Sequence, residues 1–162
     1  MGAKLSGHRY GKSRVRVVKI LRDGKRHTVL EINAQVLLEG DFESSYTSGD
    51  NSKVVATDTV KNTVHVLAKD HLTTEVERFA VHLARHFTSK YPQVQKATVE
   101  ISQRIWERMG NHDHCFSAPG SPVPWVKVEH TKGAKEAVVE SGVKDWLILK
   151  STQSGFEKYP KC

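Results

Sequence analysis

The stretch from Thr28 to Glu39, TVLEINAQVLLE, alternates apolar and polar residues with a period of two. Successive side chains of a β-strand point to opposite faces, so this stretch presents one apolar face and one polar face. The pattern predicts a long strand with one face buried in a core. The residues expected on the buried face are Leu30, Ile32, Ala34, Val36 and Leu38.

The residues just before this stretch predict its partner strand. β-branched residues recur between Ser13 and Asp23, and Asp23-Gly24-Lys25 is a typical hairpin turn. Two strands joined by so short a turn pair antiparallel. The polar face of this hairpin is then available to solvent or to another subunit.

Two helices are predicted after the hairpin. The first, Asp58–Lys69, has apolar residues on one side, although its Val and Thr residues have weak helix propensity. The second, Glu75–Lys90, has a clear 3.6-residue apolar stripe, and Thr74 and Glu77 have the spacing of a capping box. Pro92 ends this helix. The side chains expected to pack on the sheet are Val64, Leu67, Phe79, Leu83 and Phe87.

Strand patterns return after the helices. Ala97–Ile105 alternates like the second strand, whereas Asn111–Pro124 is rich in Gly, Ser and Pro and is predicted to be a loop or an irregular edge. Three shorter strands are expected at Trp125–His130, Glu136–Ser141 and Asp145–Ser151. The order of elements predicts an α+β fold, ββααββ, in which an antiparallel sheet carries both helices on its apolar face.

The composition indicates one ordinary domain with an anionic partner. A chain of 162 residues with 38% hydrophobic content is long enough to bury a core. No window approaches the roughly 18 apolar residues of a membrane helix, so no membrane partner is expected. The formal charge of +7 suits an anion. Nucleic acid is not expected, because no Arg-rich helix or aromatic RNA-reading motif accompanies the charge.

The two cysteines and a histidine pair are the first candidates for metal or redox chemistry. Cys115 and Cys162 form no disulfide framework and fit a reducing compartment. His112-Asp113-His114-Cys115 has ligand-type residues, but no second cluster completes a tetrahedral set. A solvated histidine pair is the simpler interpretation, and no metal is assigned.

Three residues are candidates for acid–base or anion-binding chemistry. Lys12 precedes the first strand; it is either an ordinary surface lysine or, if buried beside other cations, a proton acceptor near neutral pH. Thr57 and Asp58 lie at the start of the first helix. They either belong to an N-cap region or lie where free backbone N–H groups seat an anion.

Five segments resemble urate oxidase, in the same order and across nearly the whole chain. They are Tyr10-Gly11-Lys12, Leu37–Thr47 (LLEGDFESSYT), Asn51-Ser52, Val55–Thr63 (VATDTVKNT) and Leu149–Phe156 (LKSTQSGF). The resemblance implies the N-terminal half of such an enzyme. It implies an arm at residues 1–12, a single T-fold domain at residues 13–157, and an end at residues 158–162 that departs from the family pattern.

The resemblance also implies an activity, the oxidation of urate by O₂ to 5-hydroxyisourate and hydrogen peroxide in purine degradation. The family uses no metal, flavin or other cofactor. Lys12 matches the lysine that relays protons through the threonine matched by Thr57. Thr57 and Asp58 match residues that contact the purine, and Phe156 matches the aromatic residue on which the purine stacks.

Family members form homotetramers, and the remaining site residues, an arginine, a glutamine, an asparagine and a histidine, come from a neighbouring subunit. Those residues lie further along the family sequence than Cys162, so the 162-residue chain alone is expected to be inactive. A peroxisomal location is implied, but the tripeptide Ser-Lys-Leu is absent, which leaves a cytosolic location open.

Two other functions remain open at this stage. The chain is alternatively a truncated, non-catalytic T-fold isoform or fragment that acts only as an assembly partner. A T-fold activity on pterins or purine nucleotides is the other alternative, although some of those enzymes need zinc and a Cys/His set that is missing here.

Overall fold

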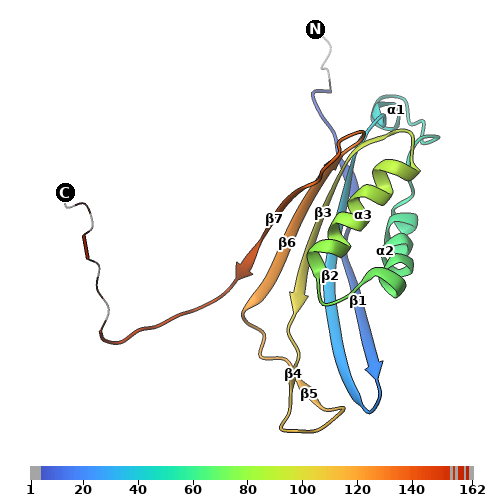
Figure 1. The fold of residues 1–162 in the computed structure, drawn as a ribbon. Helices are drawn as coiled ribbons and strands as arrows, with labels where there is room; N and C mark the ends of the chain where they lie inside the picture. Colours follow the sequence, from blue (N-terminus) through green and yellow to red (C-terminus); the bar gives the residue numbers. More distant parts are fainter. Residues whose placement is uncertain (1–4, 154, 156, 159, 161–162) are drawn as a thin grey trace.

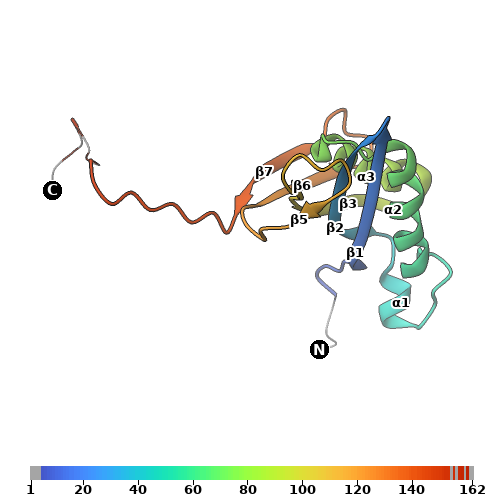
Figure 2. The same cartoon turned by 90° about the horizontal axis from the view of Figure 1, so that it is seen from below.

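The computed structural model describes residues 5–153, 155, 157–158 and 160. The elements are β1 (Tyr10–Asp23), β2 (Arg26–Gly40), α1 (Glu43–Thr47), α2 (Thr57–His71), α3 (Val76–Lys90), β3 (Val94–Arg104), β4 (Glu107–Arg108), β5 (Phe116–Ser117), β6 (Val123–Thr131) and β7 (Val138–Lys144). Five strands form an antiparallel sheet in the order β1-β2-β3-β6-β7, and α2 and α3 cover one face of it (Figure 1, Figure 2). The predicted ββααββ order is confirmed.

The core lies between the sheet and the two helices. The alternating face of β2 predicted to be buried is buried, since no residue of that set is more than 3% exposed. Helix α2 packs on β1, and α3 packs on β3 and β6. Of the helix residues expected in the core, Val64, Phe79, Leu83 and Phe87 are fully buried and Leu67 only partly.

The predicted capping box of α3 is wrong. The N-cap of this helix is Glu75, and no side chain caps it. Thr73 rather than Thr74 serves the turn ahead of the helix, since its Oγ1 accepts a hydrogen bond from the Glu75 N–H at 3.3 Å. The helix forms without a capping box because its apolar face is buried, and tertiary packing supplies most helical stability.

The predicted strand Asp145–Ser151 is also wrong. β7 begins later than expected, at Val138, and ends at Lys144. Asp145 then takes a left-handed conformation with φ of 57°, and the chain runs away from the sheet as an extended segment (Figure 1). Its apolar residues find no neighbouring strand and stay exposed, from 64% for Trp146 to 94% for Leu147.

The sheet face opposite the helices is polar, but one carboxylate on it is buried. Glu31 is 3% exposed and accepts hydrogen bonds from Arg16 at 2.7 Å and from the Trp106 indole N–H at 2.9 Å. Arg104 lies 3.4 Å from the same carboxylate. Cationic partners allow a carboxylate to stay charged when it is buried. The predicted loop Asn111–Pro124 contains the short strand β5, paired with β4, and β6 begins at its last two residues.

Candidate active site at the start of helix α2

A β-bulge decides where the Lys12 side chain points. Lys12 pairs with Val36 and Val15 pairs with Ala34, so Ser13 and Arg14 together oppose the single residue between them on β2. Arg14 has a positive φ of 57°, which is a bulge conformation. The extra residue reverses the alternation of β1. Residues directly opposite on paired strands share a face, so Lys12 lies on the face of buried Val36, which is the helix face.

The structure therefore extends the first strand into the predicted N-terminal arm. β1 begins at Tyr10 rather than at Ser13, and Lys12 is half-buried within it. Gly11 lies between these two residues, and a Cβ on it would be 1.9 Å from the Val36 carbonyl oxygen. Only glycine permits this close approach of the two backbones.

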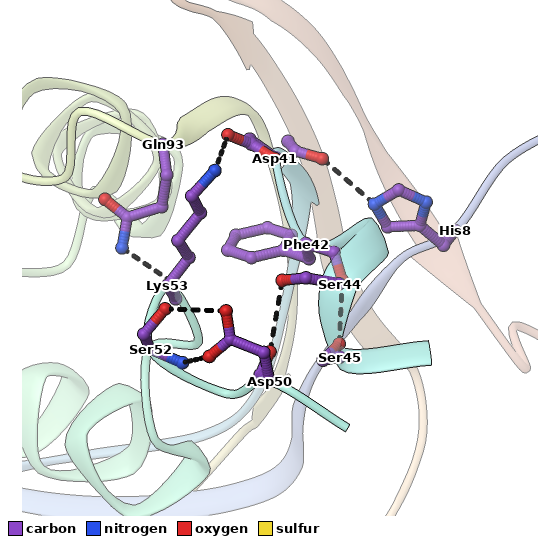
Figure 3. Close-up of polar contacts among 10 residues, drawn as sticks. His8, Asp41, Phe42, Ser44, Ser45, Asp50, Ser52, Lys53 and Gln93 are labelled. Atoms are coloured by element: carbon purple, nitrogen blue, oxygen red, sulfur yellow. Dashed lines mark hydrogen bonds and ion pairs between the residues drawn. The ribbon is translucent and has the colours of Figure 1, made fainter. Parts of the chain in front are cut away.

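The loop between β2 and α2 is held by polar contacts of its own side chains and of Gln93, which lies just before β3 (Figure 3). Asp50 accepts hydrogen bonds from the Ser52 N–H at 2.9 Å and from the Ser52 hydroxyl at 3.1 Å, and these bonds hold the pKa of Asp50 below its ordinary value. Lys53 forms an ion pair with Asp41, and the Gln93 side chain donates to the Lys53 carbonyl at 2.7 Å. These contacts fix the path of the chain toward the start of α2.

Helix α2 begins at Thr57, and its N-cap is Ala56. Thr57 and Asp58 are thus the first two helical residues, directly after the N-cap, as expected for residues at the start of the helix. Ala56 has no side-chain acceptor, and the first helical hydrogen bond runs from the Val60 N–H to the Ala56 carbonyl at 3.0 Å. The N–H groups ahead of Val60 therefore point out of an exposed helix end, where anions bind well.

Asp58 is exposed, and two cations lower the pKa of its carboxyl group. Lys61 donates a hydrogen bond to its carboxylate at 2.9 Å, and this bond, the charge of Lys61 and then the charge of Lys12 lower the pKa of Asp58. Lys12 itself lies on β1, the strand against which α2 packs. A carboxylate in the first turn also interacts favourably with the helix dipole.

The structure places three of the four predicted site residues on two neighbouring elements. Lys12 lies on β1, the strand against which α2 packs, and Thr57 and Asp58 begin α2. No hydrogen bond joins Lys12 to either of them within the described part of the chain. The prediction for Phe156 lies outside the described residues. An ammonium group beside free helix N–H groups can hold an anion and exchange a proton with it.

His112 and His114, the ligand-type histidines of the sequence, contact protein atoms. His114 Nε2 lies 2.8 Å from the Lys25 carbonyl oxygen, and His112 Nδ1 accepts a hydrogen bond from the His114 N–H at 3.0 Å. Across the described residues, no three His, Cys, Asp or Glu side chains cluster as metal ligands would. No described helix combines the length and the apolar character that crossing a membrane needs.

Two strands, two long helices and three further strands, with all five strands in one antiparallel sheet and both helices on one face of it, define a T-fold domain. Comparison with known proteins gives its family. The family model for uricase matches residues 8–129, and the chain belongs to the uricase family.

Curated relatives are similar in sequence to this chain over nearly its whole length. The uricase of Arthrobacter globiformis is 40% identical over 157 residues, which cover 97% of this chain and 51% of that protein. The uricase of Schizosaccharomyces pombe is 43% identical over 159 residues, which cover 94% of this chain and 53% of that protein. The chain spans about half the length of the curated relatives it matches.

Solved structures confirm the T-fold. The crystal structure of the Arthrobacter globiformis uricase superposes with a TM-score of 0.88 at 38% identity, over 99% of this chain and 55% of that one. A uricase from Bacillus fastidious superposes with a TM-score of 0.76 over 95% of this chain and 59% of that one, and at 22% identity it supports the fold alone.

Proposed function

We propose that this chain supplies one half of a urate oxidase, an enzyme that oxidises urate by O₂ to 5-hydroxyisourate and hydrogen peroxide in purine degradation. The proposal is supported by membership of the uricase family together with one structural observation. The bulge in β1 turns Lys12 onto the helix face, next to the exposed start of α2. Urate is an anion, and this corner offers a cation and free N–H groups.

In the proposed reaction two electrons pass from urate to O₂, which takes up two protons to become hydrogen peroxide. Water supplies the hydroxyl group of the product. An electron-rich urate dianion is itself the reductant, so the protein needs to supply deprotonation, stacking and position. We therefore propose that the enzyme works without a metal or flavin.

The roles follow the match to the family. Lys12 moves protons to and from the bound molecules through the Thr57 hydroxyl. Thr57 and Asp58 contact the purine edge, and Phe156 offers its ring for stacking. The position of Lys12 on the helix face of β1, the strand against which α2 packs, supports the first of these roles, because proton transfer needs groups within hydrogen-bond reach or joined by one water.

The complete enzyme is proposed to be a homotetramer in which a second T-fold and a neighbouring subunit complete each site. The open edges of the sheet at β1 and β7 support this, since an unpaired strand edge is a ready surface for another chain. A peroxisomal or a cytosolic location is compatible with this proposal.

The test uses Lys12→Met in a protein that joins this chain to the half of the Arthrobacter globiformis uricase that it does not match. We expect turnover of urate to fall by about a hundredfold while KM changes by less than about threefold, as removal of a proton-transfer group predicts. Urate absorbance and peroxide release give both constants.

The control is Lys61→Met, which removes the same charge from the same helix start, 2.9 Å from Asp58. It should keep turnover within about threefold of the parent protein, because Lys61 is assigned no proton transfer. Equal losses in the two variants, or full turnover by Lys12→Met, would remove Lys12 from the mechanism.

A further inference from the structure

The hydroxyl group of Tyr10 binds both backbone groups of a single residue in the loop that leads to α2. The Val55 N–H donates to the tyrosine oxygen at 2.7 Å, and the tyrosine O–H donates to the Val55 carbonyl at 3.2 Å. A phenol has one proton to donate and can accept another, so both bonds form at once. Val55 is 5% exposed, and its backbone groups would otherwise lack water.

The tyrosine ring is itself held in place. It packs edge-on against Phe42, with ring centroids 4.8 Å apart, and Phe42 is fully buried. Burial raises the pKa of Tyr10 above its ordinary value, so the hydroxyl remains protonated and able to donate at neutral pH. The ring and the hydroxyl together join β1 to the segment ahead of α2.

On both segments, two positions separate the residue of the Tyr10–Val55 contact from the predicted site residue. Lys12 follows Tyr10 by two positions, and Thr57 follows Val55 by two positions. Tyr10 and Lys12 share the helix face of β1, because both lie before the bulge. Gly11 between them holds this part of β1 tightly against β2. The Tyr10–Val55 contact therefore joins β1 to the segment ahead of α2 at a point two residues from Lys12 and two residues from Thr57.

The opposite end of α2 is anchored to the same strand in a different way. Lys19 of β1 donates to the carbonyl groups of Ala68, Lys69 and Leu72 at 3.1, 2.7 and 2.8 Å. Cations bind favourably at a helix C-terminus. Helix α2 is thus attached to β1 at both ends, and Tyr10 makes the attachment at the end that carries the site.

We propose that Tyr10 is a positioning residue, whose hydroxyl holds the start of α2 at the distance from Lys12 that proton transfer through Thr57 needs. This inference rests on the proposed function. Lys12 has no hydrogen bond to Thr57 or Asp58 among the described residues, so its alignment depends on the neighbouring contact with Val55. Sequence analysis missed Tyr10, although it opens the first segment that resembles the family.

The first experiment tests the contact without any activity. Hydrogen–deuterium exchange followed by mass spectrometry compares the parent chain with Tyr10→Phe, which keeps the ring on Phe42 and removes only the hydroxyl. We expect exchange in residues 53–58 to accelerate about tenfold or more, while the core of α3 is unchanged. Tyr46→Phe, at a residue 51% exposed, is the control and should change neither region. Unchanged exchange in residues 53–58 of Tyr10→Phe would overturn the proposal.

The second experiment measures turnover in the two-half protein described above. Tyr10→Phe should lower kcat about tenfold and leave KM within about threefold, since misplacement of a proton-transfer group costs rate more than binding. Adding Tyr10→Phe to Lys12→Met should cause no further loss, because the hydroxyl acts only through Lys12.

The two proposals fail in different ways. If Lys12→Met keeps full turnover, the proposed role of Lys12 is wrong, whatever Tyr10 does. If Lys12→Met loses turnover and Tyr10→Phe keeps it, the positioning role is wrong and the proposed function stands. Additive losses in the double variant would also contradict the positioning role, because they would show that Tyr10 acts independently of Lys12.

Discussion

Gly11 lies in β1 just before the bulge that orients Lys12, at a point where the backbone of β2 leaves no room for a side chain. A Cβ at this position would lie 1.9 Å from the Val36 carbonyl oxygen, so alanine forces the two strands apart. The hydrogen bonds of the edge strand β1 and the orientation of Lys12 both depend on that contact. A change of one methyl group therefore acts on stability and on the site together.

We expect Gly11→Ala to destabilise the chain by about 1–3 kcal/mol, the usual cost of overpacking. The midpoint of urea unfolding measures this change. Gly7→Ala is the matched control, because a Cβ there meets nothing within 4 Å, and it should leave the midpoint unchanged. Equal stability of both variants would mean that β1 moves away from β2 without cost.

At the scale of elements, α2 and α3 are in contact through a stacked pair of histidines. His71 at the end of α2 and His82 in α3 have ring centroids 3.9 Å apart. Burial, and then the charge of His71, lower the pKa of His82 from its ordinary value of 6.5. The charged groups around the pair are Asp70, Glu75 and Arg78. Two protonated rings at this distance repel each other.

This pair predicts a loss of stability in mild acid. Because the folded pKa of His82 is depressed, the native state binds fewer protons than the unfolded state below pH 6.5. The stability that neutral His82 contributes to the native state is fully present above pH 6.5. It is lost as the pH falls through the folded pKa of His82. The stability difference between the parent chain and His82→Gln should therefore shrink as the pH falls from about 7.5 to about 5. A difference that is constant with pH would contradict this.

Strand and helix patterns in the sequence predicted most elements, because burial on one face imposes a period on the residues. The buried face of β2 and the stripe of α3 are the clearest cases. Predictions from local sequence patterns failed where tertiary contacts determine the structure. The Thr74 and Glu77 spacing forms no cap, and the apolar run after Lys144 leaves the sheet.

The candidate site was predictable only in part, because its geometry depends on the bulge. Period-two counting from Val15 places Lys12 on the open face, and only the extra residue opposite β2 moves it to the helix face. Nothing in the period of the sequence signals this reversal. The resemblance to the family identified Lys12, Thr57 and Asp58, and the structure supplied the reason that they meet.

At the scale of the whole molecule, the described domain exposes surfaces that isolated proteins usually cover. β1 and β7 are open edges of the sheet, and Trp146–Leu149 extends from the body as an apolar run (Figure 1). Exposed edges and exposed apolar segments both favour pairing with another chain.

We therefore expect the isolated chain to associate at micromolar concentration. Sedimentation velocity should show oligomers or aggregates, and Leu147→Lys, at a position 94% exposed, should reduce them without loss of folding. The extra charge opposes apolar association and costs little at an exposed site. A well-behaved monomer of the parent chain would contradict this expectation.

The last prediction concerns turnover by the chain alone, and it follows from the share of the proposed site that the chain holds. Thr57 and Asp58 begin α2 and Lys12 lies on the strand against which α2 packs, but the chain spans about half the length of its curated relatives. The family resemblance places an arginine and a glutamine of the site beyond this chain. In the isolated chain these two residues are not available to hold the purine. Loss of a buried charged contact costs about 2–5 kcal/mol, and each 1 Å of misplacement costs about a hundredfold in rate.

We accordingly expect no measurable oxidation of urate by the isolated 162-residue chain. The same chain joined to the half of the Arthrobacter globiformis uricase that it does not match should be active without added metal, and a chelator should not inhibit it. Urate absorbance and peroxide release are followed for both proteins. Turnover by the isolated chain would show that this half contains a sufficient site. Inhibition by the chelator, reversed by a metal ion, would overturn the proposed metal-free mechanism.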